Sequence, residues 1–296
     1  MHLPSLSRIG IAGATGLVGS ELRSILRNRG VAERCIVASS TEQCPLWFLA
    51  TPPDVSRSLV AELRSDDTTI IDLSSAFRLD VPLVVPELNG GVLDAAPQLV
   101  ASPNCTATIL ALAVSPLLPF GIASITVSTY QAISGAGQEA LQELGRERPT
   151  ERPILGEPLS HNVFRHESAI DSATGRTGEE QKLIEESRRL LALPELPITA
   201  TCMRVPVRRS HLESLTVELD TAPPAADVAA AFRLSTAVTF LDDRCPTALS
   251  VEGRDDVILG HLRHNSPTSI SMVAAGDQLR VGAALNAVRI AEQLPH

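Results

Sequence analysis

The sequence predicts the α/β class: a doubly wound, Rossmann-type nucleotide-binding domain interrupted by an inserted α+β domain. Two observations favour this architecture. Strand-like and helix-like segments alternate from residue 9 to about residue 101, which is typical of a parallel sheet. From residue 122 onward, several stretches alternate polar and β-branched residues, which is typical of antiparallel strands. A final helix is expected at residues 283–293.

The first turn of the chain carries the clearest motif. Residues 9–12 form an apolar strand signal, residues 13–19 read Gly-Ala-Thr-Gly-Leu-Val-Gly, and residues 20–28 have the apolar spacing of a helix. Such glycines let a backbone approach a pyrophosphate, and a helix N-terminus offers unpaired N–H groups. The spacing is G-x-x-G-x-x-G rather than G-x-G-x-x-G. Its place between a strand and a helix favours a nucleotide site over a plain tight turn.

The next two strand candidates, residues 35–38 and 46–50, lie unusually close together, with only residues 41–45 between Ser40 and Leu46. Parallel strands need a crossover of about a dozen residues, and five extended residues reach only about 17 Å. Either one of the two runs is not a parallel strand, or the sheet is trimmed at this edge.

Beyond this edge the expected elements follow in order. Helices are expected at 52–64 and 106–118, and strands at 69–73, 122–130, 199–207, 214–219, 238–240 and 258–262. The predicted domains are residues 1–106 with 271–296, and residues 107–270. The proline- and charge-rich stretch 146–158 is the best loop candidate.

Composition limits the classes of function. The 296 residues carry a net charge of −9 with only 3% aromatics, which argues against a nucleic-acid partner. Five scattered cysteines without a C-x-x-C pair make a structural zinc site improbable, and no metal is expected. We see no signal-peptide pattern and no apolar run of 18 residues. The sequence therefore predicts a cytoplasmic protein that contacts no membrane.

A cysteine stands where a reactive thiolate would be placed. Residues 102–105 read Ser-Pro-Asn-Cys and lie between two apolar runs, so Cys105 falls at the start of the helical run. A helix N-terminus stabilises negative charge and lowers a thiol pKa. His211 is the preferred proton-transfer partner. Arg204 and His211 are seven residues apart and would face opposite sides of a regular strand, so a bend near Pro206 or Ser210 is needed to bring both into one pocket.

Four further side chains could serve such a cysteine. Glu179 and Lys182 can share one helix face, although a solvated ion pair explains that spacing more simply. Arg78 follows the carboxyl end of a strand and could bind an anion or form a surface salt bridge. Gln131 could orient a carboxylate or a thioester carbonyl, or cap the following turn. Together these residues indicate cysteine-dependent carbonyl or acyl-phosphate redox chemistry.

Seven segments, in the family's order over nearly the whole chain, resemble aspartate-semialdehyde dehydrogenases. They are residues 13–19, 74–78, 84–89, 102–106, 128–137, 204–211 and 282–287. The related acetylglutamyl-phosphate reductases differ around the cysteine. The resemblance implies NADP-dependent reductive dephosphorylation of L-aspartyl 4-phosphate to L-aspartate 4-semialdehyde, in the biosynthesis of lysine, threonine and methionine, by a cytoplasmic homodimer.

The resemblance also implies a role for each site residue. Cys105 would expel phosphate and form a thioester, which a nicotinamide hydride reduces, with His211 as acid/base and Gln131 orienting the acyl group. The implied substrate contacts are Arg204 to the α-carboxylate, Glu179 to the ammonium, Arg78 and Lys182 to phosphate, and Asn104. The implied cofactor-binding residues are Gly13, Thr15, Gly16, Leu17, Val18, Ser39, Ser134, Gly135 and Gln278.

The chain departs from the family between its second and third strand candidates, where family members are longer. That stretch carries a basic residue that contacts the adenosine 2′-phosphate, whereas residues 39–43 here read Ser-Ser-Thr-Glu-Gln. Glu42 lies near where NAD enzymes place a ribose-binding carboxylate. Val281 and Gln278 stand where lysine and asparagine are usual. NADP is expected from the resemblance, with NAD possible, and the departures leave three interpretations of the cofactor site: it favours NAD, it binds NADP weakly, or it has lost useful cofactor binding. Three alternatives to the family's activity also stay open: an NAD-preferring paralogue, a paralogue for another acyl phosphate or aldehyde, and a non-catalytic paralogue.

Overall fold

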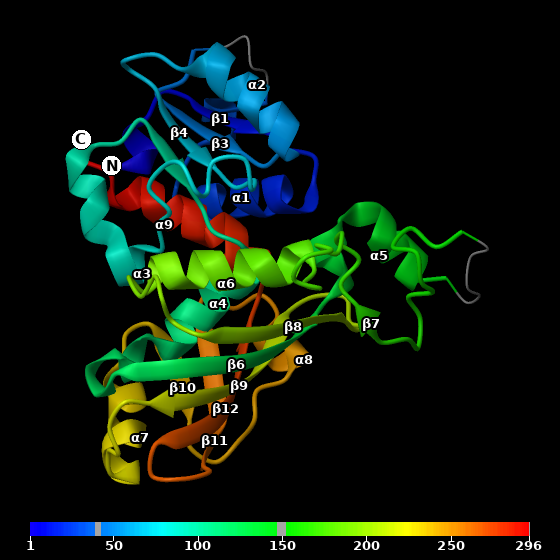
Figure 1. Cartoon of the computed structure of the whole chain (residues 1–296). Coiled ribbons are helices and arrows are strands. Elements are labelled where there is room, and N and C mark those ends of the chain that lie inside the picture. The colour runs from blue at the N-terminus through cyan, green and yellow to red at the C-terminus, as the bar shows by residue number, and fades with distance from the viewer. Residues whose placement is uncertain (39–42, 147–151, 296) are drawn as a thin grey trace. The chain divides into compact units, whose positions relative to one another are not determined.

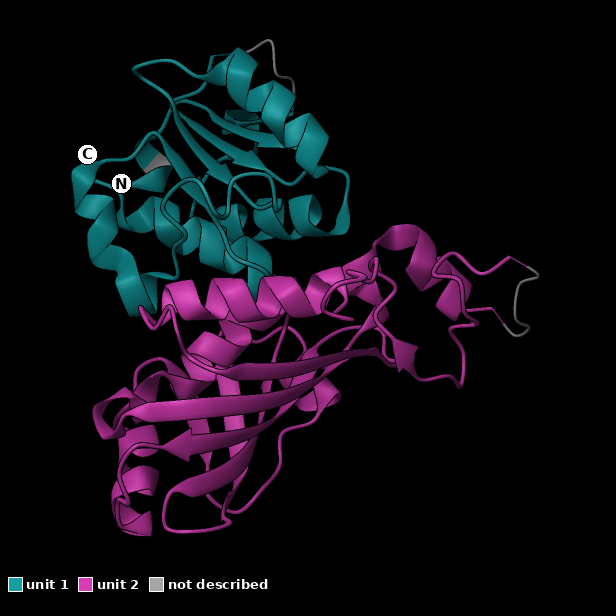
Figure 2. Ribbon diagram, viewed as in Figure 1, with its two compact units in different colours: residues 1–104, 282–296 teal, residues 105–281 magenta. Residues whose placement is uncertain are grey.

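The computed structural model describes residues 1–38, 43–146 and 152–295 (Figure 1). The chain divides into two compact units, Met1–Asn104 with Gly282–His296 and Cys105–Val281 (Figure 2). The second unit is thus an insertion in the first, as the α/β class with an inserted domain predicts. The predicted limits of the dinucleotide-binding domain, 1–106 with 271–296, and of the catalytic and dimerisation domain, 107–270, stay a prediction.

The first unit is built on a five-stranded sheet with the order β2-β1-β3-β4-β5. Every pair of neighbouring strands in it is parallel. The strands are β1 (Ile9–Ala12), β2 (Ile36–Val37), β3 (Leu46–Leu49), β4 (Thr69–Asp72) and β5 (Leu99–Ala101). The helices are α1 (Leu17–Asn28), α2 (Pro53–Leu63), α3 (Pro86–Asn89) and α9 (Leu285–Gln293).

Helices cover both faces of this sheet, which is the doubly wound arrangement (Figure 1). On β3, Leu46 and Phe48 pack with residues of α1 and α9, whereas Trp47 and Leu49 pack with Val60 of α2. Alternate residues of a strand point to opposite faces, so a strand buried on both sides reads as a continuous apolar run. The Rossmann-type prediction is confirmed.

The sheet is trimmed at its β2 edge, which decides between the two alternatives left by the sequence. Both β2 and β3 pair in parallel with β1, on opposite sides of it, and both begin opposite Ile9. Because β2 has only two residues, the chain does not have to travel back along a full strand before it enters β3. Ser39 and Glu42, the predicted cofactor contacts of this segment, lie outside the described residues.

The second unit is built on a seven-stranded sheet with the order β10-β11-β12-β9-β6-β8-β7. Four of its neighbouring pairs are antiparallel, and β10·β11 and β6·β8 are parallel. The strands are β6 (Ile122–Gln131), β7 (Phe164–Arg165), β8 (Ile198–Arg204), β9 (His211–Leu219), β10 (Val238–Leu241), β11 (Val257–His264) and β12 (Ser269–Gly276). The predicted mostly antiparallel sheet is therefore present, with β12 as a strand that the pattern analysis missed.

Two helices of the second unit carry predicted site residues. Helix α4 (Cys105–Val114) is buried at every position after Cys105, and it ends earlier than predicted because Pro116 lies in the following 3-10 turn. Helix α6 (Gly178–Leu190) contacts α4 and β8. The other helices are α5 (Gln138–Leu144), α7 (Ala225–Leu234) and α8 (Ala248–Val251). Within the described ranges, none of the helices combines the length and apolar character needed to cross a bilayer.

Candidate active site

Three neighbouring strands bring three predicted residues to one end of the second sheet. Gln131 ends β6, Arg204 ends β8 and His211 begins β9. Gln131 is paired with Arg204, and Tyr130 is paired with Leu212, so that the next step of that register sets Gln131 opposite His211. All three side chains are buried. Topology alone thus aligns an amide, a guanidinium and an imidazole.

The bend that the sequence required between Arg204 and His211 is present. Residues 205–210 connect the two strands, and Ser210 takes the left-handed backbone conformation with φ of 77° directly before His211. The connection is held to the turn after β6, because Ile133 and Ser134 donate backbone hydrogen bonds to the carbonyls of Val207 and Arg208. The chain therefore reverses between Arg204 and His211, on either side of β6, and the two residues do not lie on one continuous strand.

His211 is held by the main chain in a neutral form. The backbone N–H of Ala132 donates to its Nδ1 over 3.0 Å, so the neutral ring carries its proton on Nε2. Burial, and then the charge of Arg204, lower the pKa of His211 from 6.5 to about 3. Nε2 is buried and has no hydrogen-bond partner among the described residues. The ring therefore presents an unused N–H donor.

Gly135 lies close to both His211 and Arg204. A Cβ at Gly135 would lie 3.1 Å from Nη1 of Arg204, 3.5 Å from Cε1 of His211 and 3.6 Å from its Nε2. A side chain at this position would therefore crowd both polar groups. The adjacent Ser134 receives a hydrogen bond from Nε2 of Gln278, whose Oε1 accepts from the N–H of Ser210 over 2.7 Å. Two predicted cofactor residues therefore brace the loop that carries His211.

Glu179 connects Gln131 to the helix α6. Nε2 of Gln131 donates to Oε1 of Glu179 over 3.1 Å, and Oε1 of Gln131 accepts from Thr129. Nζ of Lys182 lies 3.5 Å from Oε2 of Glu179. The predicted pair exists, but Glu179 is buried and only Lys182 is exposed, so this is not a solvated surface pair. The structure places Gln131, Glu179 and Lys182 in one network.

The helix start distinguishes Glu179 from Glu180. Thr177 and Glu180 form a capping box, in which each side chain accepts from the other residue's N–H. Oε1 of Glu180 also accepts from the N–H of Cys202. Glu180 is thereby committed to holding α6 and β8, and Glu179 is the carboxylate that reaches the site.

Arg204 has a partner that the sequence did not suggest. Glu167, two residues after β7, accepts from Nε over 2.9 Å and from Nη2 over 2.7 Å, a bidentate pair. Nη2 also lies 2.8 Å from Nε2 of His166, and Nη1 donates to the carbonyl of Ala132. A residue 37 positions away in sequence gives no local signal of this contact.

Cys105 is the first residue of α4 and is partly exposed. Ile109, one helical turn along, lies against Gly276, whose register partner on β9 is His211. Residues four apart share one face of a helix, so Cys105 lies on the face that packs toward the His211 end of the sheet. Burial raises the pKa of the Cys202 thiol, which keeps this buried cysteine protonated.

Glu213 is a buried acid that the sequence analysis also missed. It follows His211 by two residues on β9, so both side chains lie on the same face of the sheet. Both carboxyl oxygens are buried without a hydrogen-bond partner among the described residues. Burial raises the pKa of Glu213 well above its usual value. A neutral carboxylic acid therefore lies beside the imidazole.

Two predicted substrate contacts belong to the first unit: Arg78, which was assigned to phosphate, and Asn104. Nε of Arg78 donates to the carbonyl of Ser102, and Nη2 donates to that of Leu73, both over 3.0 Å. Leu73 follows β4 and Ser102 follows β5, so Arg78 lies at the carboxyl edge of the sheet, as predicted. Asn104 is buried at the end of the same unit.

The glycine turn after β1 requires a glycine at position 13. Gly13 has φ of 79°, and a Cβ there would lie 2.2 Å from the carbonyl oxygen of Ala50. Gly16 occupies the N-cap position of α1, which has no side-chain cap and no acidic residue in its first turn. The N–H groups of the first turn, at Leu17 and Val18, are therefore not covered by a capping side chain, and Thr15 is exposed beside them.

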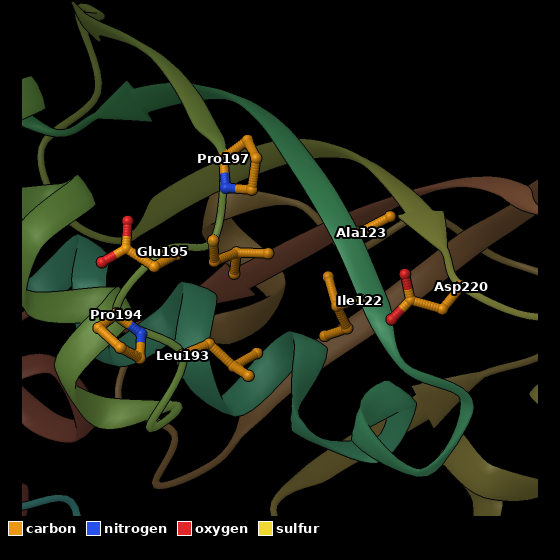
Figure 3. Close-up of a pocket in the computed structure, with 8 residues that line it drawn as sticks. Ile122, Ala123, Leu193, Pro194, Glu195, Pro197 and Asp220 are labelled. Carbon is orange, nitrogen blue, oxygen red and sulfur yellow. The ribbon is translucent and has the colours of Figure 1, made fainter.

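One pocket of the second unit lies away from these residues (Figure 3). It has a volume of about 310 Å³ and is lined by Ile122, Ala123, residues 193–197 and Asp220. Ile122 begins β6 and Gln131 ends it, so the pocket and the predicted site occupy opposite ends of the strand. Among the described residues, no three His, Cys, Asp or Glu side chains are grouped to hold a metal ion.

Comparison with known proteins defines the class. Residues 36–96 match the family model of the semialdehyde dehydrogenase NAD-binding domain, and residues 114–281 match that of the semialdehyde dehydrogenase dimerisation domain. The chain is 34% identical to an aspartate-semialdehyde dehydrogenase of Synechocystis, covering 99% of this chain and 98% of that protein. These are the domains of an oxidoreductase that binds a nicotinamide dinucleotide.

Two solved structures agree with this class. A crystal structure of aspartate semialdehyde dehydrogenase II from Vibrio cholerae superposes with a TM-score of 0.91, at 26% identity, and the match covers 97% of this chain and 98% of that chain. A second structure of that enzyme, complexed with ASA, superposes with a TM-score of 0.90 at the same identity, and the match covers 97% of both chains. The chain belongs to the aspartate-semialdehyde dehydrogenase family.

Proposed function

We propose that the chain catalyses the NADP-dependent reductive dephosphorylation of L-aspartyl 4-phosphate to L-aspartate 4-semialdehyde through a thioester on Cys105. The observation that carries the proposal is that the unpartnered Nε2–H of His211 and the guanidinium of Arg204 both lie close to Gly135. One group can donate to a developing oxyanion while the other pairs with a carboxylate. A substrate that carries an acyl group and an α-carboxylate fits both.

The remaining residues supply the other contacts of an amino-acid acyl phosphate. Cys105, at the N-terminus of α4, attacks the acyl carbon, and phosphate leaves. The Nε2–H of His211 stabilises the oxygen of the tetrahedral adduct. Gln131, fixed by Thr129 and Glu179, orients the acyl group, and Lys182 compensates phosphate charge.

The cofactor side rests on the first unit. A nicotinamide dinucleotide supplies the hydride that reduces the thioester. The uncapped N-terminus of α1 after the Gly13 turn can receive its pyrophosphate, with Thr15, Gly16, Leu17 and Val18 around it. We propose NADP as the preferred form and a homodimer as the assembly. The dimerisation-domain match and the exposed outer side of β6, where Tyr130 is 40% exposed, support the dimer.

The experiment is phosphate-dependent reduction of NADP, and of NAD in parallel, with L-aspartate semialdehyde and purified protein. Turnover with NADP supports the proposal, and turnover with NAD alone would give the NAD-preferring alternative. Cys105→Ala must abolish turnover, whereas Cys245→Ala, which removes an exposed cysteine, must retain it. Turnover that survives in Cys105→Ala contradicts the thioester route.

A further inference from the structure

We propose that Asp277 is a positioning residue: it holds the strained backbone at Ser210 and thereby fixes the place of the His211 imidazole. The inference rests on the proposed function and deepens it. Ser210 directly precedes His211, the first residue of β9. Asp277 directly follows Gly276, which is the register partner of His211 on β12. The residue that leads into His211 and the residue that follows its strand partner are therefore neighbours.

Ser210 carries two unfavourable features. Its φ of 77° lies in the left-handed region, which a residue with a Cβ avoids. Its hydroxyl is buried and has no hydrogen-bond partner among the described residues. A strained backbone persists only where the surrounding structure determines it. Contacts from elsewhere in the unit must therefore hold Ser210 in this conformation.

Asp277 supplies such contacts from one fully buried carboxylate. Its Oδ2 accepts from Nε of Arg209 over 2.7 Å and from the N–H of Gly253 over 2.6 Å. Its Oδ1 accepts from the N–H of Leu279 over 3.1 Å. The side chain of Arg209 is 22% exposed, so the carboxylate is the fixed partner of this charged pair. Asp277 thus anchors the residue directly before Ser210.

Gln278 adds a second hold on Ser210. Oε1 of Gln278 accepts from the N–H of Ser210 over 2.7 Å, and its Nε2 donates to Oγ of Ser134. The turn that presents this amide is closed by the hydrogen bond from the N–H of Leu279 to Asp277. Asp277 therefore acts on Ser210 by two routes, one through the guanidinium of the preceding residue and one through this amide.

Release of this hold would move the imidazole. Ser210 leads directly into His211, whose Nδ1 accepts from the N–H of Ala132 over 3.0 Å. A return of Ser210 to negative φ would turn the start of β9 and break this hydrogen bond. Arg204 and Glu179 lie on β8 and α6 and would stay in place. The loss should therefore fall on the chemical step more than on substrate binding.

The test combines Asp277→Asn with Ser210→Gly, since glycine adopts the left-handed conformation without strain. We expect Asp277→Asn alone to lower kcat by about tenfold or more and to leave KM within about twofold. In the Ser210→Gly background the same substitution should lower kcat by less than about threefold, because the backbone no longer has to be held. Ala192→Gly, which relaxes another residue with positive φ (56°), should give no such rescue.

Arg209→Met opens the same contact from its partly exposed partner, and it replaces Asp277→Asn if that variant does not fold. Its cost in kcat should depend on Ser210→Gly in the same way. A readout without turnover is the nitrogen NMR signal of the His211 ring, assigned by its loss in His211→Gln. We expect this signal to shift in Asp277→Asn and to return when Ser210→Gly is added.

Three results would overturn the inference. The first is an equal loss of kcat from Asp277→Asn with and without Ser210→Gly. The second is an equal rescue by Ala192→Gly, since the carboxylate would then support only the fold. The third is a His211 ring signal that Asp277→Asn leaves in place. The NMR experiment decides the inference even if the parent protein shows no turnover, a result that counts against the proposed function alone.

Discussion

The backbone N–H of Ala132 and Nδ1 of His211 form a hydrogen bond of 3.0 Å. A peptide N–H cannot change its protonation, so it holds the ring in the tautomer with the proton on Nε2 and opposes a second proton on Nδ1. The fixed tautomer leaves the Nε2–H as the group of His211 that would donate to an oxyanion under the proposed function. The buried position acts in the same direction, because desolvation disfavours the imidazolium.

The first prediction concerns stability in acid. The folded-state pKa of His211 is about 3 and the unfolded value about 6.5, so its contribution to stability is complete above pH 6.5 and is lost as pH falls toward 3. We expect the thermal midpoint of His211→Gln to fall less than that of the parent between pH 6.5 and pH 4.5. Parallel midpoint curves for the two proteins over this interval would contradict the assigned pKa.

The second prediction is that Glu213 gives the opposite dependence of folding stability on pH. Its pKa is raised in the folded state, so its contribution is complete below about pH 4.5, the unfolded value, and is lost as pH rises toward the folded value. Glu213→Gln keeps the shape and cannot ionise. We expect it to raise the thermal midpoint at pH 8 more than at pH 5, by the equivalent of about 1–3 kcal/mol at the higher pH. An equal change at both pH values would show that Glu213 does not titrate in this range.

Gly135→Ala tests the close approach of Gly135 to His211 and Arg204. The added methyl group would stand 3.1 Å from Nη1 of Arg204 and 3.5 Å from Cε1 of His211. We expect kcat/KM to fall by about a hundredfold, because displacements near 1 Å are costly at a reacting centre. Gly145→Ala is the matched control, since a Cβ there meets its nearest atom at 3.6 Å. Comparable losses in both variants would mean that the methyl group acts through folding.

Thr15→Asp tests the dinucleotide turn without weakening the fold. A carboxylate beside the uncapped N-terminus of α1 favours the helix but repels a pyrophosphate. We therefore expect an unchanged or higher thermal midpoint together with a dissociation constant for NADP at least about tenfold higher. Ser20→Asp, one helical turn further along, is the control and should weaken binding much less. NADP affinity that is unaffected by Thr15→Asp would place the pyrophosphate elsewhere.

The sequence predicted the elements whose patterns are local. The glycine turn after Ile9–Ala12, the helix that begins at Cys105 and the alternation of Ile122–Gln131 all follow from neighbouring residues, and all are present. The strand β12 was missed because polar and apolar residues alternate only in its first half, 269–272, and the second half, 273–276, is a buried Val-Ala-Ala-Gly run with no alternation.

The site was predictable up to the point where contacts become non-local. The odd spacing of Arg204 and His211 correctly predicted a bend between them, because the alternation of side chains along a strand is a local rule. Glu167 and Glu213 carry no such signal, since their meaning comes from a guanidinium 37 residues away and from complete burial on an inner strand. The Glu179–Glu180 ambiguity likewise needed the capping box to be seen.

The division of the chain after Asn104 has a chemical consequence. Cys105, Gln131, Arg204 and His211 all lie on one unbroken stretch of polypeptide, and the Gly13 turn lies in the other unit. Under the proposed function, acylation and reduction would therefore depend on different parts of the polypeptide and could fail independently. A protein damaged only in the glycine turn should still take up the acyl group and then lose it slowly to water, wasting the activated phosphate instead of conserving it as an aldehyde.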